Sequence, residues 1–297
     1  MMRCASVVFV LLWALQGCSG GEPVPAERYQ QSDGFVTKAI ANIESNPDLQ
    51  LVVDIDHSRL GHGAGSPMPP SRVLIFSDAR LESELIQHNP LVALDLPLRV
   101  LAFESSSSQK SNVIYNAFDY VASRHRLTGD NIPELAERYG EAMSAAVVGL
   151  PQDALAVFAN DNMQAEGIVT IESPYGFNET LSRVKTAIES QDDTVYFGEV
   201  DFQANAASVG VDLMPSHMIL FGGPGPGGKA MAKSPTLGLD AFCQKFLIWQ
   251  DQAGVVRLSF NDLLALARRQ QVSIAPALRV INFRLNKVFE EALLAGE

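Results

Sequence analysis

Cysteine is scarce in this chain, and the few cysteines leave no pair for a disulfide in the mature protein. Only 3 of the 297 residues are cysteine. Cys4 lies within an N-terminal signal and Cys18 stands at its end, so Cys243 alone remains, inside an apolar run. A free cysteine in such a run behaves as a small buried hydrophobic residue. The sequence therefore argues against disulfide or thiol-based redox chemistry.

Basic residues are also few. The chain has 22 lysines and arginines against 34 aspartates and glutamates, which gives a net charge of −12. An acidic protein is repelled by phosphate backbones and by anionic lipid headgroups, so we expect no nucleic-acid partner. The hydrophobic content of 47% and the charged content of 19% are typical of globular domains.

Familiar catalytic motifs are missing as well. The sequence has no Gly-x-Ser-x-Gly elbow, Cys-x-x-Cys pair or Cys-His pair. The segment 223–229 (Gly-Pro-Gly-Pro-Gly-Gly-Lys) has the position of a phosphate-binding loop, between a strand and a helix. Pro224 and Pro226 have no backbone N–H to offer a phosphate, and Ala230 replaces the hydroxyl residue that holds magnesium. We therefore expect a tight turn here, and no cofactor.

The N-terminus has the layout of a secretory signal. Arg3 precedes an apolar run that is too short to span a bilayer, and the run ends in Leu-Gln-Gly followed by Cys18. This ending resembles the bacterial lipobox, in which the cysteine is acylated after cleavage. We expect a signal peptide at residues 1–17, a tether at 18–32, and lipid anchoring through Cys18 in the outer membrane, facing the periplasm. The alternatives are an ordinary signal with a chance cysteine and an uncleaved anchor.

The remainder of the chain is an internal repeat. A shift of 145 residues aligns the chain with itself without a gap over some eighty positions. The identical pairs include Asp56 and Asp201, Gly65 and Gly210, Phe76 and Phe221, Pro90 and Pro235, Asp95 and Asp240, Asn116 and Asn261, and Arg124 and Arg269. We expect a first repeat domain at residues 33–150 and a second at 165–297, paired within the chain.

Each copy shows the same order of elements. A helix with apolar residues at helical spacing precedes two strands, a short helix, a hairpin and a closing helix. The short helices are expected at 82–87 and 229–233, and further helices at 132–148 and 275–294. The pattern predicts an α+β sandwich, an antiparallel sheet with helices on one face. The strand at 168–171 has no clear counterpart in copy one, where the tether, the run 154–158 or another molecule could supply the sheet edge.

Motifs in both copies resemble domain-of-unknown-function family 302. Copy one has Ile-Asp-His at 55–57 and Asp-Leu-Pro at 95–97, and copy two has Phe-Gly-Gly-Pro at 221–224 and Ser-Phe-Asn-Asp at 259–262. Copy two departs with Phe202 in place of the histidine and Ala241-Phe242 in place of Leu-Pro. The resemblance implies a TBP-like fold, usually as paired domains, and it brings no established activity.

Several polar residues that recur between the copies are candidates for ligand binding. They are Asp56, His57, Asp95, Asn116, Asp201, Asp240 and Asn261. The structural interpretation of Asp95 and Asp240 is that they form turns or caps before a strand.

A metal site is a second interpretation of the same region. Asp54, Asp56, His57 and His62 lie near a strand end, and carboxylates with a neutral imidazole can bind a divalent ion. The spacing matches no recognised metal motif, and a histidine bonded to the backbone explains His57 as well.

Two functions follow. The first is a tethered, non-catalytic module that binds a small molecule or an envelope protein in the groove between its repeats. The alternative is an enzyme or metal protein with a single site in copy one, around Asp56, His57 and Asp95.

Overall fold

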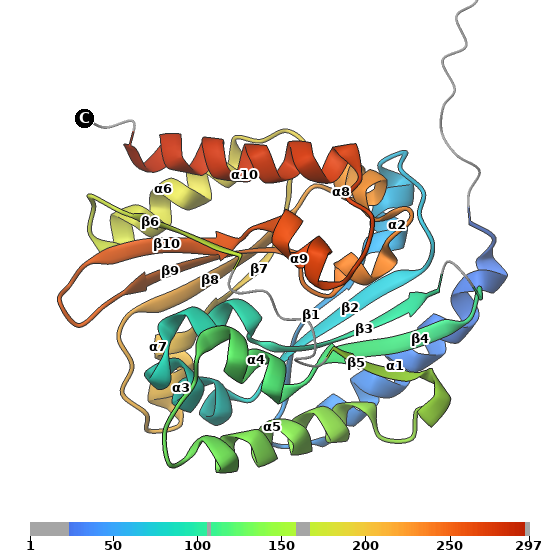
Figure 1. Cartoon of the computed structure of the whole chain (residues 1–297), viewed down its shortest axis with the longest axis horizontal. Coiled ribbons are helices and arrows are strands. Elements are labelled where there is room, and N and C mark those ends of the chain that lie inside the picture. Colours follow the sequence, from blue (N-terminus) through green and yellow to red (C-terminus); the bar gives the residue numbers. More distant parts are fainter. Residues whose placement is uncertain (1–23, 106–107, 159–166, 295–297) are drawn as a thin grey trace, which may run out of the picture.

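The computed structural model describes residues 24–105, 108–158 and 167–294 (Figure 1). The expected signal peptide and residues 18–23, with Cys18, lie outside the described residues. The rest of the expected tether is not a free linker, because a 3-10 helix, η1 (Ala26–Tyr29), and the start of the first α-helix, which begins at Gln30, lie within it. The described chain folds into two α+β units, each with a five-stranded sheet. The α+β fold expected from the sequence is confirmed.

The first unit is built from five helices and five strands, with short 3-10 segments between them. In chain order they are α1 (Gln30–Ser45), β1 (Gln50–Asp56), α2 (His57–Gly63), β2 (Ser71–Ser77), α3 (Ala79–His88), η2 (Pro90–Asp95), β3 (Leu98–Glu104), β4 (Ser111–Asn116), α4 (Phe118–His125), α5 (Ile132–Val147) and β5 (Leu155–Phe158).

The second unit repeats this order, with its additional strand at the beginning. Its elements are β6 (Ile168–Glu172), α6 (Phe177–Glu189), β7 (Val195–Asp201), α7 (Phe202–Ser208), β8 (Ser216–Gly222), α8 (Pro224–Met231), η5 (Pro235–Gly238), β9 (Gln244–Gln250), β10 (Val256–Asn261), α9 (Leu263–Arg269) and α10 (Pro276–Leu294).

The two sheets have matching strand orders, β1-β2-β3-β4-β5 and β6-β10-β9-β8-β7. Four strands of each sheet form an antiparallel meander, and the fifth strand lies beside β4 or β10. β5 runs parallel to β4, whereas β6 runs antiparallel to β10. The run at 154–158 therefore supplies the edge of the first sheet, and this sheet extends past residue 150.

Details of the backbone repeat together with the topology. β1 has an irregularity between Leu51 and Val53, and β7 has one at the corresponding place, between Tyr196 and Gly198. The aligned glycines at 65 and 210 both have positive φ, +69° and +75°. Glycine adopts a positive φ at little energetic cost because it has no Cβ. The duplication thus preserved local geometry as well as residue type.

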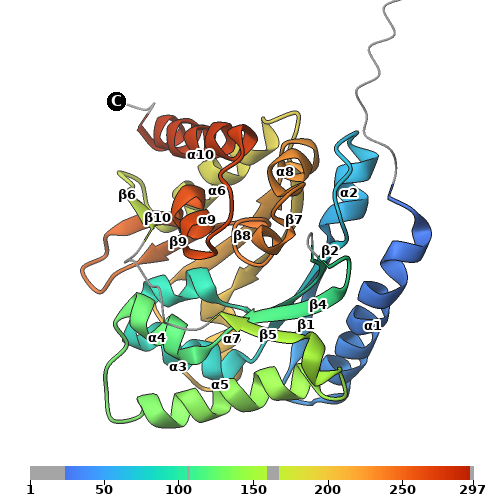
Figure 2. The same cartoon turned by 45° about the vertical axis from the view of Figure 1, so that its right-hand side comes forward.

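Each sheet is covered on one face by helices of its own unit. α1 presents Phe35, Val36, Ala39 and Ile43 to the core, at the spacing of one helical face. α6 does the same in the second unit with Val184 and Ile188. α5 packs beside α1 and α10 packs beside α6, and both add buried residues to the core of their unit. α5 and α10 lie on opposite sides of the molecule (Figures 1 and 2).

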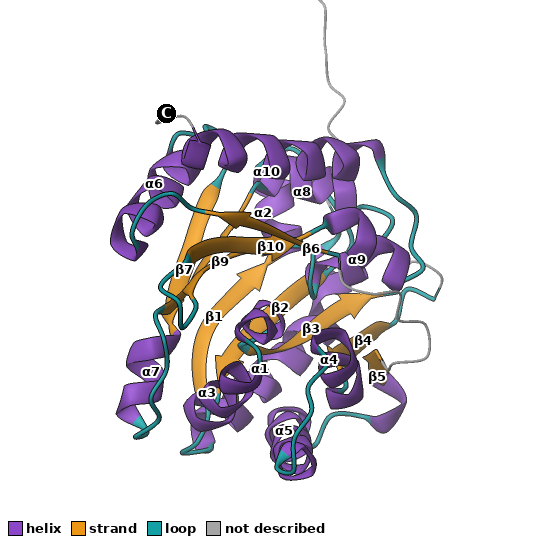
Figure 3. Ribbon diagram, turned by 60° about the vertical axis from the view of Figure 1, so that its left-hand side comes forward, coloured by secondary structure: helices purple, strands orange, loops and turns teal. Residues whose placement is uncertain are grey.

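The two units pack against each other through equivalent elements, which gives the molecule an approximate two-fold symmetry (Figure 3). α2 contacts α8, and its equivalent α7 contacts α3. η2 lies against β9 and β10, and η5 lies against β2 and β3. The chain just before β3 in the first unit, and just before β9 in the second, is therefore inserted against the sheet of the other unit.

Two local predictions were wrong. α2 and α7 were not expected as helices, and α8 begins at Pro224 rather than at residue 229. The Pro/Gly segment is thus helical and not a tight turn, since proline is well tolerated at the first helical position. Its glycines serve close packing: a Cβ on Gly228 would lie 2.4 Å from the carbonyl oxygen of Ser66 and 3.3 Å from Cα of Gly61.

Candidate functional site

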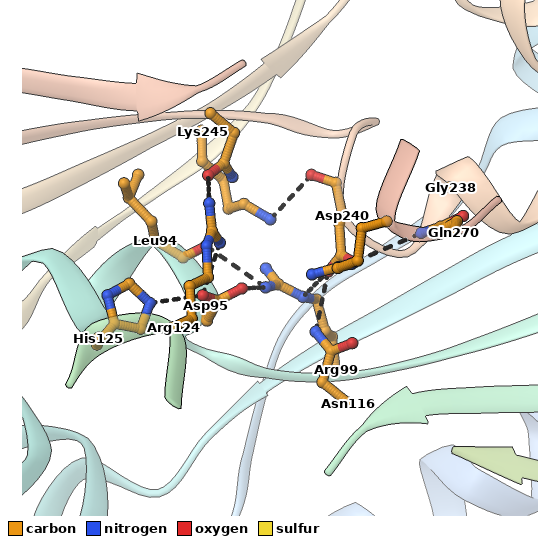
Figure 4. A network of polar contacts seen from close by, with 12 residues as sticks. Leu94, Asp95, Arg99, Asn116, Arg124, His125, Gly238, Asp240, Lys245 and Gln270 are labelled. Carbon is orange, nitrogen blue, oxygen red and sulfur yellow. Dashed lines mark hydrogen bonds and ion pairs between the residues drawn. The ribbon is translucent and has the colours of Figure 1, made fainter. Parts of the chain in front are cut away.

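The most unusual polar feature of the molecule is a buried ionic network at the junction of the two repeats (Figure 4). Asp95 ends η2 and Asp240 lies just after η5, so both carboxylates belong to the segments that each repeat inserts against the other. Both side chains are almost completely buried, with 0% and 1% of their surface exposed. Charges at this depth need compensating partners.

Asp95 has three such partners, all from its own repeat. Arg124 donates to Oδ2 from Nη1 over 2.7 Å, and Nε2 of His125 lies 2.6 Å from the same oxygen. Arg99 donates to Oδ1 from Nη2 over 3.2 Å. Burial by itself raises the pKa of Asp95, but Arg124, His125 and Arg99 outweigh it and hold this pKa well below its usual value.

Asp240 is held by both repeats. Arg269 forms an ion pair with its Oδ2, as Arg124 does with Asp95. Nδ2 of Asn116 donates to Oδ1 over 3.1 Å, and Nε of Arg99 lies 3.3 Å from the same oxygen. Arg99 therefore contacts both buried carboxylates and connects the two halves of the network.

A second contact across the junction mirrors the bond from Asn116. Nη2 of Arg124 donates to Oδ1 of Asn261 over 2.6 Å. Each repeat thus places its strand-end asparagine beside a charged residue of the other repeat. The network is composite, and neither repeat forms it alone.

Lys245 adds a buried cationic group to the network. Its amine donates to the backbone oxygen of Asp240 over 3.3 Å, and among the described residues it forms no ion pair with a carboxylate. Burial, with a contribution from Arg99, lowers the pKa of Lys245 to about 7. Burial likewise lowers the pKa of Arg269 to about 10. In the part of the chain that the structure describes, Lys245 is therefore a buried amine without a carboxylate partner.

Several guanidinium groups also have hydrogen-bonding capacity left over. Within the described part of the chain, no residue accepts a hydrogen bond from Nη1 of Arg99 or from Nη1 of Arg269. The guanidinium of Arg269 lies over the ring of Tyr120, 4.2 Å from its centroid, which offers a cation–π contact but no acceptor oxygen.

A small cavity of about 200 Å³ adjoins the network. Its polar wall is formed by Asp240, Gln244, Lys245 and Asn261, and every one of its lining residues is buried. The apolar wall consists of Ala241, Phe246, Phe260, Leu263 and Leu285. The polar wall thus combines the amine of Lys245 with the carboxylate of Asp240 and two side-chain amides.

The structure brings together four of the residues singled out from the sequence: Asp95, Asn116, Asp240 and Asn261. Asp95 and Asp240 do lie in turns before a strand, as the sequence suggested, but their carboxylates pair with buried cations and do not cap those turns. Asp56 and Asp201 lie elsewhere and cap helices: they accept from the backbone N–H of Arg59 and Ala204.

His57 is separate from this network. It is buried against the other repeat, with Nε2 3.2 Å from the carbonyl oxygen of Gly238. Burial lowers its pKa to about 4, so the ring is neutral at neutral pH and donates to this oxygen. Asp56, His57 and Asp95 thus have different partners and do not form a joint site.

The metal interpretation of this region finds no assembled ligand set. Asp54 forms an ion pair with Arg72, and Asp56 pairs with Arg59. His62 lies near the end of α2. Among the described residues, no three histidine, cysteine or acidic side chains are grouped so that they could hold a metal ion.

Sequence reasoning did not single out the cations of the network as site residues. These are Arg99, Arg124, His125, Lys245 and Arg269, with Gln270 beside them. The identity of Arg124 and Arg269 in the repeat alignment was the available signal. Arg99 and Lys245 had none, because each lies within an apolar strand pattern.

Known proteins resemble parts of this chain. A fluoride-specific ion channel, FluC 1, of Brucella suis biovar 1 (strain 1330) is 37% identical over 109 residues, which cover 37% of this chain and 42% of the channel protein. FluC 1 of Brucella abortus biovar 1 (strain 9-941) is also 37% identical over 109 residues, or 40% of its length. The match thus spans less than half of these relatives. In the described part of this chain, no helix has the length and apolar character needed to cross a membrane.

The family comparison agrees with the duplication. The crystal structure of an uncharacterized conserved protein DUF302 from Bacillus stearothermophilus matches 43% of this chain and 97% of its own, with a TM-score of 0.36 and 18% identity. The model of the family described as "Domain of unknown function DUF302" matches twice, at residues 29–148 and 169–292. The chain therefore belongs to the DUF302 family and carries two copies of its domain.

Proposed function

We propose that this chain is a lipid-anchored protein of the bacterial cell envelope that binds a halide ion at the junction of its repeats and catalyses no reaction. One observation carries the proposal: the buried amine of Lys245 has no carboxylate partner among the described residues and lies in the wall of a cavity, near the open N–H groups of Arg99 and Arg269. The bound ion would be the missing counter-charge.

The energetic argument rests on the cost of unpaired buried charge. Leaving one member of a buried ionic group without a partner typically costs about 3–5 kcal/mol. The Lys245 amine and the open N–H groups of Arg99 and Arg269 favour an anion near them. The cationic residues at the junction come from both repeats. The anion site would therefore need both copies of the domain.

The size and walls of the cavity favour a monoatomic ion. A large organic anion does not fit a buried space of about 200 Å³ with four aromatic or leucine side chains among its walls. A halide needs only a few donors and a dry enclosure. Lys245 would supply the charge, and the Gln244 and Asn261 amides would supply N–H donors.

The names of the Brucella relatives suggest which ion to test first. Their printed names describe fluoride-specific channels, and the shared stretch is about two fifths of their length. We take fluoride as the first ligand to test and chloride as the second.

Anchoring rests on the sequence alone. Leu-Gln-Gly before Cys18 supports acylation of that cysteine, with the folded repeats held in the periplasm at the outer membrane. Metabolic labelling with an alkyne analogue of palmitate should mark the wild-type chain. A Cys18→Ser variant that labels equally well would overturn this part of the proposal.

Halide binding is tested on the chain lacking residues 1–18, by titration calorimetry and thermal unfolding in sodium fluoride, sodium chloride and sodium gluconate at equal ionic strength. We expect a saturable rise of Tm with fluoride or chloride but none with gluconate, whose anion is too large. Lys245→Met should abolish the rise, whereas Lys287→Met, at an exposed lysine of α10, should leave it unchanged. Equal Tm values in all three salts, with no heat of binding, would refute the proposal.

A further inference from the structure

A second pocket lies in the second repeat, which has Phe202 in place of the histidine of the Ile-Asp-His motif. It has a volume of about 430 Å³ and lies between α10, the start of α8 and the turn that joins α6 to β7. Its residues are Gln191, Asp193, Thr194, Phe221, Gly223, Pro226, Gln244, Ile281, Arg284, Leu285, Val288 and Phe289.

Comparison of the repeats explains why the pocket exists. In the 145-residue register, α3 places Leu81 and Leu85 where α8 has Pro226 and Ala230. Both leucines are completely buried in the core of the first repeat. Of the two smaller residues, Pro226 lines the pocket, so the side-chain volume of Leu81 is missing at this position. The unusual Pro/Gly composition of α8 thus coincides with an opening beneath α10.

The interior of this pocket is apolar and aromatic. The rings of Phe221 and Phe289 have centroids 6.0 Å apart. Ile281, Leu285 and Val288 of α10 complete the wall, at the spacing of one helical face. Such a surface accommodates an alkyl chain or a single ring, and burial of each CH₂ group contributes about 0.8 kcal/mol.

A guanidinium group marks one end of the pocket. Arg284 donates to Asp193 from both Nη atoms, over 2.7 and 2.8 Å, and to Oε1 of Gln191 over 3.0 Å. The ion pair is about two fifths exposed on each side. Solvent screening makes such pairs weak, so a ligand carboxylate can share or replace Asp193 at little cost.

From this geometry we infer that the pocket binds a small apolar monocarboxylate. The apolar body lies against Phe221, Leu285 and Phe289, and the carboxylate pairs with Arg284 at the rim. The site is chemically distinct from the halide cavity, although Gln244 and Leu285 line both.

Octanoate is the probe for this inference, titrated into the chain lacking residues 1–18 and followed by calorimetry and by methyl NMR. We expect saturable binding, with shifts of the Ile281, Leu285 and Val288 methyl resonances and none at Val280, which is 59% exposed on the same helix. Arg284→Gln should weaken octanoate by up to about fivefold, as expected for a solvent-screened ion pair, and affect octanol little. Equal affinity of octanoate and octanol would overturn the role of Arg284, and no methyl shift would overturn the site.

A filling substitution provides the structural control. Val288→Trp should abolish octanoate binding by occupying the pocket, whereas Val280→Trp on the exposed face of α10 should not. If Val288→Trp does not fold, Pro226→Leu restores the side chain of the first repeat and should weaken binding for the same reason. Undiminished binding in the folded filling variant would contradict the inference. Lys245→Met should retain octanoate binding, which separates this site from the halide cavity.

Discussion

Asn116 in the first repeat donates a hydrogen bond from Nδ2 to Oδ1 of Asp240 in the second, over 3.1 Å. Both side chains are buried, and Arg124 makes the reciprocal contact with Asn261. Separation of the repeats would therefore break buried bonds to charged groups and leave their partners unpaired. The two domains are energetically one unit at this junction, although each has its own sheet.

The first prediction concerns the buried carboxylate of Asp240. Asp240→Asn removes the partner of Arg269 and one partner of Arg99, so uncompensated cations remain buried. We expect a loss of about 3–5 kcal/mol in the free energy of unfolding, measured by urea denaturation. Asp251→Asn, which removes an exposed partner of Arg257 in a hairpin turn, should hardly move the midpoint. Equal midpoints for the two variants would contradict the importance of the network.

The second prediction concerns the close contact of α2 and α8. A Cβ on Gly228 would lie 2.4 Å from the backbone oxygen of Ser66, so Gly228→Ala forces the helices apart and should lower Tm by several degrees. Gly225→Ala lies in the same helix and meets only ordinary contacts, the nearest at 3.7 Å from Ala64. This control should keep or raise Tm, because alanine favours helix by up to about 1 kcal/mol. A stabilising Gly228→Ala would show that the helices do not approach in this way.

Much of the fold was predictable from the sequence, because strand patterns and the repeat are local or periodic signals. α2 was not predictable in this way. Gly61 and Gly63 are poor helix formers, and the helix is stabilised by the cap from Asp56 and by packing on α8 of the other repeat. The tertiary contact with α8 outweighs the low helix propensity of this segment, and the sequence alone does not reveal that contact.

The site was predictable only in part, for a similar reason. Asp95 before a strand has the local pattern of a turn residue, and its partner Arg124 lies 29 positions away along the chain. Arg99 belongs to a strand whose residues are all buried, where a charged side chain is expected only with partners. The identities between the repeats pointed to Asp240 and Asn261. However, the polar residues of the two repeats form one network only because of how the repeats pack against each other, and the sequence does not show that packing.

The third prediction concerns Glu82 on α3. Its side chain is buried beside Ser77, which donates to Oε2 over 2.6 Å. Burial, with a contribution from Asp78, raises the pKa of Glu82 to about 8. Because the folded-state pKa lies above the unfolded value, the contribution of this group is complete at low pH and is lost as pH rises through 8. Glu82→Gln mimics the neutral acid and should remove this loss, about 1.4 kcal/mol per pH unit between the two pKa values.

Unfolding free energies at pH 5, 6, 7 and 8 test this relationship. Glu82→Gln should gain on the wild type steadily across the series. Glu84→Gln on the same helix removes a partly exposed partner of Arg138 and serves as the matched control, with no such gain expected. Parallel curves for wild type and Glu82→Gln would mean that Glu82 is already ionised in the folded protein.

The last prediction concerns the pH dependence of halide affinity and rests on the proposed function. Burial lowers the pKa of Lys245 to about 7, so its amine is charged below this pH and loses its proton above it. A halide binds the charged form, so affinity should be constant below pH 6 and fall above pH 7, approaching tenfold per unit. Lys245→Arg keeps its charge over this range and should flatten the profile, since guanidinium groups stay protonated. Calorimetric titrations with fluoride and chloride at pH 5.5, 6.5, 7.5 and 8.5 provide the measurement, and a wild-type affinity unchanged from pH 6 to 8.5 would exclude Lys245 as the charge that holds the ion.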